Sequence, residues 1–128
     1  WPQAALAREA QASWQALSTC RLDTVAGDYW LAGLIATASP DEPAVFITQD
    51  ERYSPWVTLP RLQAHGALWV WQGDGVPEPP LLGRLRAQDG GAGLREHQGQ
   101  WRMAWPHDHA GEPLVVHWRA YVPAACAR

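Results

Sequence analysis

The stretch VAGDYWLAG, residues 25–33, has the residue types of a strand end, a tight turn and a helix start. Such a junction often holds a phosphate, because the N–H groups and the dipole of a helix N-terminus attract anions. Phosphate loops usually carry clustered glycines, whereas only Gly27 precedes this helix and Gly33 lies inside it. Asp28 places a carboxylate where the phosphate would bind, and its oxygen can cap the helix. We therefore expect a structural turn with no cofactor.

The sequence HDH, residues 107–109, is the best candidate for a metal site. Zinc prefers three or four ligands in a defined geometry, and His107 and His109 offer only a partial set. His97 or His117 could join them only if folding brought them near. We expect a solvated turn at this place and no metal.

The acidic segments PDE and QDER place carboxylates near arginine, as acid–base pairs do. Both segments lie in polar loops, however, where charge is expected. No nucleophile elbow, Cys–His signature or paired-carboxylate spacing is present in the sequence. We therefore assign no catalytic residue.

The two cysteines flank the expected sheet, with Cys20 just before the first strand and Cys126 just after the last. If those two strands are antiparallel neighbours, both cysteines fall at one end of the sheet. A disulfide would then be geometrically allowed and would indicate an oxidising compartment. The sequence leaves both the bonded and the free state open.

The elements that must position these residues alternate along the first half of the chain. Continuous apolar runs predict three parallel core strands near 22–26, 44–48 and 67–71. Helical patterns alternate with them, at about 2–18, 29–39 and 58–64. The helix after Asp28 is apolar nearly all round, so we expect it to be largely buried. A short helix near 81–87 then precedes an antiparallel hairpin near 100–105 and 114–122.

This order predicts a single α/β domain over residues 1–128. It is a three-layer domain whose short parallel, Rossmann-like sheet is extended by the antiparallel C-terminal hairpin. The net charge is −3, all ten basic residues are arginines and they are scattered, so nucleic-acid binding is not expected. The chain begins at Trp1 with no visible signal peptide, and we expect it to be the C-terminal piece of a longer protein.

Nine tryptophans are an unusually large number for this length. Three of them fall on apolar elements and are expected in the core: Trp30, Trp69 and Trp118. Trp56 follows Tyr53 in a polar loop, and two interpretations stay open. Trp56 either folds back to plug the end of the sheet, or it marks, with Tyr53, a face turned toward a membrane or partner helices.

Three segments carry a family resemblance: VAGDYWLAGLIATASPDEPAVFI (25–47), SPWVTLPRLQAHGALWVW (54–71) and VHWRAYVP (116–123). In their order and spacing they resemble the C-terminal extracytoplasmic domain of bacterial membrane glycosyltransferases. The superfamily is that of dolichyl-phosphate-mannose protein-mannosyltransferases and aminoarabinose transferases. The resemblance covers about 6–71 and 114–123 and fades between them.

The resemblance implies a non-catalytic accessory domain on the periplasmic side of the inner membrane. The transferase would take its sugar from a polyprenyl-phosphate donor, with its catalytic carboxylates in a transmembrane body outside this sequence. Expected partners are that body and, beyond it, the membrane surface or the lipid-linked sugar. Two alternatives remain: a free-standing periplasmic module that binds a ligand or protein, and a small cytosolic α/β enzyme.

Overall fold

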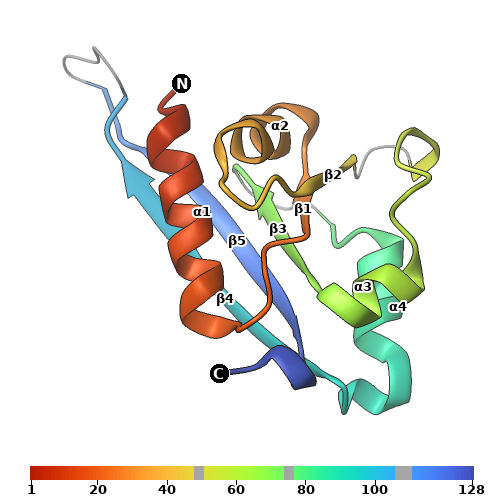
Figure 1. The fold of residues 1–128 in the computed structure, drawn as a ribbon. Coiled ribbons are helices and arrows are strands. Elements are labelled where there is room, and N and C mark those ends of the chain that lie inside the picture. The colour runs from red at the N-terminus through yellow and green to blue at the C-terminus, as the bar shows by residue number, and fades with distance from the viewer. Residues whose placement is uncertain (48–50, 74–76, 106–110) are drawn as a thin grey trace.

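The computed structural model describes residues 1–128 except 48–50, 74–76 and 106–110. Its centre is a five-stranded mixed sheet with the strand order β2-β1-β3-β5-β4 (Figure 1). The strands are β1 (Thr24–Gly27), β2 (Ala44–Ile47), β3 (Ala67–Trp71), β4 (Leu94–Met103) and β5 (Leu114–Pro123). The first three are parallel, and β5 runs antiparallel to both β3 and β4. The predicted α/β architecture, a parallel sheet with a C-terminal hairpin, is thereby confirmed.

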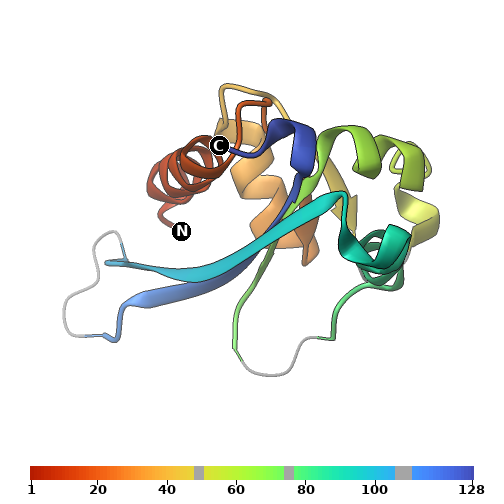
Figure 2. The same cartoon turned by 90° about the horizontal axis from the view of Figure 1, so that it is seen from below.

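Helices cover the sheet on both faces. They are α1 (Gln3–Leu17), α2 (Tyr29–Ala38), α3 (Leu59–His65) and α4 (Pro80–Ala87), with short 3₁₀ turns η1 (Glu51–Tyr53), η2 (Gln88–Gly91) and η3 (Ala124–Cys126). One core contains α1 and α2 with apolar residues from β1, β3, β4 and β5. A second core contains α3 and α4 with other residues of the sheet. Figure 1 shows α1 running beside β4 and β5, and Figure 2 shows the same helix nearly end-on, on one side of these two strands.

One face of α1 packs into the larger core. Leu6, Ala10 and Trp14 are fully buried, because residues spaced three and four apart share one face of a helix. Gly27 at the end of β1 has a different role. A Cβ atom on Gly27 would lie 2.4 Å from the carbonyl oxygen of Val70, so only glycine lets β1 and β3 approach this closely.

The second helix differs from its prediction, because it is a surface helix and not a largely buried one. Leu31, Ala32 and Ile35 face the core, whereas Tyr29 and Trp30 are exposed. The expected core position of Trp30 is therefore wrong. Helix α2 packs one side against β1, β2 and α1, and apolar residues continue onto its solvent side. None of the helices in the described ranges is both long enough and apolar enough to cross a membrane.

The other two tryptophans predicted in the core, Trp69 and Trp118, differ in their burial. Trp69 is buried as predicted, while Trp118 is only partly buried. Trp118 lies opposite Gly99 of the edge strand β4, where a Cβ atom would approach its ring to 2.8 Å. The indole of Trp118 also stacks on Trp101, with ring centroids 6.0 Å apart. Glycine at 99 thus leaves room for an aromatic ring that covers the edge of the sheet.

Candidate functional site

An open pocket of about 450 Å³ lies at the carboxyl ends of β1 and β3. Asp28 follows β1 directly, and Gln72 follows β3 directly. The chain leaves β1 toward β2 on one side and leaves β3 toward the hairpin on the other. Adjacent parallel strands whose connections diverge in this way form a topological switch point, where open α/β sheets bind ligands. The pocket therefore lies where this fold places ligand sites.

Local structure fixes the residues at the start of α2. Asp28 accepts a hydrogen bond from the backbone N–H of Leu31 at 2.7 Å, which confirms the predicted N-cap. The capped helix then places Tyr29 and Trp30 in its first turn, with 69% and 48% of their surfaces exposed. The carboxylate occupies the helix N-terminus that an anion would need. This arrangement supports the interpretation that the turn has a structural role and is not a phosphate-binding site.

Two segments distant in sequence complete an aromatic cluster around Trp30. The ring centroid of Trp1 lies 6.1 Å from that of Trp30 and 5.0 Å from that of Trp105, both in edge-to-face geometry. The side-chain amide of Gln3 donates a hydrogen bond to the carbonyl of Leu34 at 3.1 Å, which ties the start of α1 to α2. Trp1 and Trp30 both line the pocket.

The pocket also holds polar atoms that are not used within the described part of the chain. Asp28 caps α2 through Oδ1, while its Oδ2 makes no hydrogen bond to the described residues. The side-chain amide of Gln72 likewise has no partner there. The lining side chains are one carboxylate, one amide and three aromatic rings, with no cationic side chain among them: Trp1, Asp28, Tyr29, Trp30 and Gln72. Such a pocket can offer both hydrogen bonds and ring contacts to a ligand.

Replacing Asp28 by alanine removes the cap and is expected to lower the free energy of unfolding by about 0.5–2 kcal/mol. Asp28→Asn should recover most of that loss, because asparagine caps a helix about as well. Urea unfolding followed by tryptophan fluorescence measures both variants against the wild type. Equal losses in the two variants would contradict a capping role and would indicate that the carboxylate charge itself matters.

The loop after β2 presents the two aromatic residues predicted as an interface. Ser54 anchors this loop, because its hydroxyl accepts from the N–H of Ile47 at 3.0 Å and donates to the carbonyl of Val45 at 3.3 Å. Buried Val57 forms a second anchor. Tyr53 directly precedes Ser54, and Trp56 lies between Ser54 and Val57. Their side chains are 65% and 50% exposed. Trp56 therefore does not plug the sheet, and the interface hypothesis keeps its structural basis.

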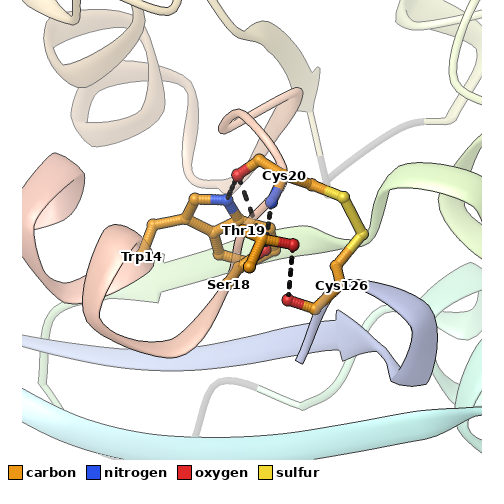
Figure 3. Close-up of a disulfide and its surroundings, with 5 residues drawn as sticks. All are labelled: Trp14, Ser18, Thr19, Cys20 and Cys126. Atoms are coloured by element: carbon orange, nitrogen blue, oxygen red, sulfur yellow. Dashed lines mark hydrogen bonds between the residues drawn. A yellow bond between two sulfur atoms is a disulfide. The ribbon is translucent and has the colours of Figure 1, made fainter. Parts of the chain in front are cut away.

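Cys20 and Cys126 form a disulfide that joins the approach to β1 with the end of β5 (Figure 3). The sequence made this disulfide conditional on the first and last strands being antiparallel neighbours. That condition needs one correction, because β1 and β5 are antiparallel but β3 lies between them. The start of β1 and the end of β5 still lie at the same end of the sheet, and the Cα atoms of Cys20 and Cys126 are 5.4 Å apart. Thr19 reinforces the junction, with its N–H and hydroxyl both donating to the carbonyl of Cys126.

The histidine motif His107, Asp108 and His109 lies outside the described residues. His97 is exposed on β4, and His117 stacks on Trp71 with ring centroids 5.6 Å apart. Within the described ranges, no group of three or more histidine, cysteine, aspartate or glutamate residues could hold a metal ion.

A polar cluster that the sequence did not indicate lies on the α4 face of the sheet. The hydroxyl of buried Tyr121 donates to Glu78 Oε2 at 2.5 Å, and Arg86 and Arg119 pair with the same oxygen at 2.5 and 3.5 Å. Burial, and then the adjacent carboxylate, raise the pKa of Tyr121, so it remains a phenol and a donor. The cluster joins β5 to the segment before α4, which is a structural role.

Sequence reasoning did not find the pocket residues Trp1, Tyr29 and Gln72. The switch-point rule could have indicated Gln72, because it follows a predicted parallel strand. The position of Trp1 depends on how α1 packs against α2, which no local pattern specifies. Comparisons with family models, with curated proteins and with solved structures found no match to this chain.

Proposed function

We propose that this chain is a non-catalytic accessory domain of a bacterial membrane glycosyltransferase, lying on the periplasmic side of the inner membrane. The transferase would use a polyprenyl-phosphate-linked sugar donor. The domain would contact the transmembrane body of the enzyme, near the membrane surface where the donor is presented. The motif order in residues 25–47, 54–71 and 116–123 suggests this family.

One observation carries the proposal. In the described part of the chain, every large hydrophobic side chain that is strongly exposed is a tryptophan or a tyrosine: Trp1, Tyr29, Trp30, Tyr53 and Trp56. Leucine, isoleucine and valine side chains would be the usual alternative, but those in the described residues are buried or only partly exposed. Tryptophan and tyrosine suit contact with a membrane interface or a partner, because each combines an apolar ring with a polar group.

The disulfide supports the proposed compartment. Disulfides persist in oxidising environments such as the periplasm and are rare in the bacterial cytosol. A small cytosolic α/β enzyme is therefore the weakest of the three alternatives. The free-standing periplasmic binding module is favoured by the switch-point pocket, and it differs from the proposal in having no membrane body.

An assay of sugar transfer separates these functions. The 128-residue chain, incubated with a polyprenyl-phosphate sugar and an acceptor, is expected to give no transfer, because the described residues hold no catalytic constellation. In membranes containing the full-length protein, the double change Tyr53→Ala and Trp56→Ala is expected to lower transfer about five- to thirtyfold. That range corresponds to about 1–2 kcal/mol of lost contact.

Arg8→Ala serves as the matched control for that assay, because Arg8 is exposed on α1 and lies neither in the loop of Tyr53 and Trp56 nor in the lining of the pocket. It should leave transfer unchanged. Transfer by the 128-residue chain alone would refute the accessory role. A gene that encodes no membrane helices before this domain would favour the free-standing module instead.

A further inference from the structure

We propose that the pocket at the carboxyl ends of β1 and β3 binds a pyranose ring of a neutral glycan. The exposed rings of Tyr29 and Trp30 would pack against the C–H surface of the sugar, while Asp28 and Gln72 would bind its hydroxyl groups. This inference rests on the proposed function for its biological purpose, since the glycan would belong to the donor or acceptor of the transferase. The binding itself is a property of this chain and can be measured without the membrane body.

The geometry supplies both kinds of contact in one place. The pocket volume of about 450 Å³ is within the range of small-molecule sites and accommodates one sugar ring. Asp28 and Gln72 follow adjacent strands, so the carboxylate and the amide lie in the lining of the same pocket. The aromatic rings come from the first turn of α2 and from Trp1.

The chemistry of the lining discriminates among ligand classes. An anion is disfavoured, because the pocket contains a carboxylate and no cationic side chain. A fully apolar ligand would desolvate Asp28 and Gln72 without replacing their hydrogen bonds. A simple organic cation would satisfy the rings and Asp28, but it would leave the amide of Gln72 without a partner. A neutral polyhydroxylated ring can satisfy the rings, the carboxylate and the amide together.

A second hollow extends the site along α2. It has a volume of about 240 Å³ and shares Tyr29 and Trp30 with the first pocket. Gly33 lines this hollow, and a Cβ atom added at Gly33 would meet no atom within 4 Å. Two adjacent hollows on either side of the same pair of rings fit two consecutive sugar units. The structure therefore favours an oligosaccharide over a single free sugar.

The test is an NMR titration of the 128-residue chain, in which each tryptophan gives its own indole N–H signal. The probes are the methyl pyranosides of glucose, mannose, galactose and N-acetylglucosamine, followed by a disaccharide of the best of them. At least one probe should shift the signals of Trp1 and Trp30 with a Kd of about 1–10 mM, and the disaccharide should bind about tenfold more tightly. The signal of Trp56 should stay in place.

Variants then locate the ligand. Trp30→Ala and Gln72→Ala are each expected to weaken sugar binding about tenfold, and Trp56→Ala, which also removes an exposed tryptophan, should have no effect. Gly33→Gln should fill the second hollow without disturbing the helix. It should therefore abolish the advantage of the disaccharide while leaving the monosaccharide affinity intact.

Two results would overturn the glycan inference. One is the absence of any shift with every sugar probe up to about ten times the expected Kd. The other is a shift of Trp1 and Trp30 by tetramethylammonium but by none of the sugars, which would make the pocket a cation site. Neither result affects the proposed accessory role, which the transfer assay tests separately. Conversely, sugar binding by a protein shown to have no membrane body would leave this inference standing and the proposed function wrong.

Discussion

The double change Cys20→Ala and Cys126→Ala is expected to lower the free energy of unfolding by about 4–5 kcal/mol. The disulfide joins residues 106 positions apart, so it closes a loop that contains most of the chain. In the chain-entropy model, the stabilisation grows with the length of the closed loop, because the unfolded ensemble loses more conformations. A loss of this size is a large part of the stability of a typical domain.

Hydrogen bonds around the disulfide also stabilise the folded state. Trp14 is fully buried and donates its indole N–H to the carbonyl of Cys20 at 2.9 Å, while Ser18 accepts from the N–H of Cys20 at 3.0 Å (Figure 3). These bonds hold the turn after α1 in place beside the C-terminal 3₁₀ turn η3. Without the covalent link, we expect the C-terminal segment to open locally before the sheet unfolds.

Urea unfolding of the oxidised wild type and the double alanine variant measures this prediction. Reduced wild-type protein is the matched control, since it breaks the disulfide without changing the sequence, and it should unfold near the midpoint of the variant. An unchanged midpoint in both samples would contradict the prediction. It would show that the backbone contacts between Thr19 and Cys126 are sufficient to hold the two ends together.

The parallel half of the fold could be predicted because its signals are local. The strand predicted at 67–71 matches β3, and the Asp28 cap and the short helix near 81–87 are also confirmed. Fully buried strands produce continuous apolar runs, and their position in the sequence hardly depends on the neighbours they acquire. The chain alternates such runs with helices, and right-handed crossovers then determine the architecture.

Strand β4 shows where local signals fail. The sequence predicted a strand only near 100–105, whereas β4 begins at Leu94. Most of its residues are exposed, so the polar segment before Trp101 carries no alternation of apolar and polar side chains. Its strand conformation comes from pairing with β5 along its entire length. Tertiary pairing therefore overrides local propensity in this segment.

The candidate pocket was only partly predictable for a related reason. The Gly27–Asp28 turn has the position of an anion site in the sequence, but the sequence favoured a structural turn. The capping bond from Leu31 to Asp28 agrees with that interpretation. The aromatic surface beside it was missed, because an apolar helix was equated with a buried one. Whether Trp30 faces the core or solvent depends on the direction from which the sheet and α1 approach α2. That direction is a property of the assembled fold.

Replacing Arg61 by methionine is expected to lower the free energy of unfolding at pH 7 by about 3 kcal/mol. Asp23, the residue immediately before β1, has a side chain that is only 8% exposed. Arg61 of α3 binds it through two nitrogens, with Nε 2.8 Å from Oδ2 and Nη2 3.3 Å from Oδ1. Arg21 lies at the edge of this pair, 3.4 Å from Oδ1. Without Arg61, the buried carboxylate loses its main counter-charge.

The effect should depend on pH in a specific direction. Burial by itself raises the pKa of Asp23. The hydrogen bond and charge of Arg61, followed by the charge of His65 and a hydrogen bond from Thr24, together outweigh burial and leave the pKa below the usual 3.8. In the wild type, the stabilisation from ionised Asp23 is therefore complete above pH 3.8 and is lost as the pH falls through the lowered value. In Arg61→Met, burial is opposed more weakly, so the folded state binds a proton more readily. The stability difference between the two proteins should consequently shrink as the pH falls below about 4.

Urea unfolding at pH 7, 5, 3.5 and 2.5 tests this expectation, with Arg84→Met as the control. Arg84 is an exposed arginine on α4, so its loss should cost less than about 0.5 kcal/mol at every pH. The double change Asp23→Leu and Arg61→Met should recover much of the stability, because it leaves no buried charge behind. A loss in Arg61→Met that is the same at all four pH values would contradict the electrostatic explanation. The apolar stem of Arg61 would then be the part that stabilises the start of β1, by packing and not by charge.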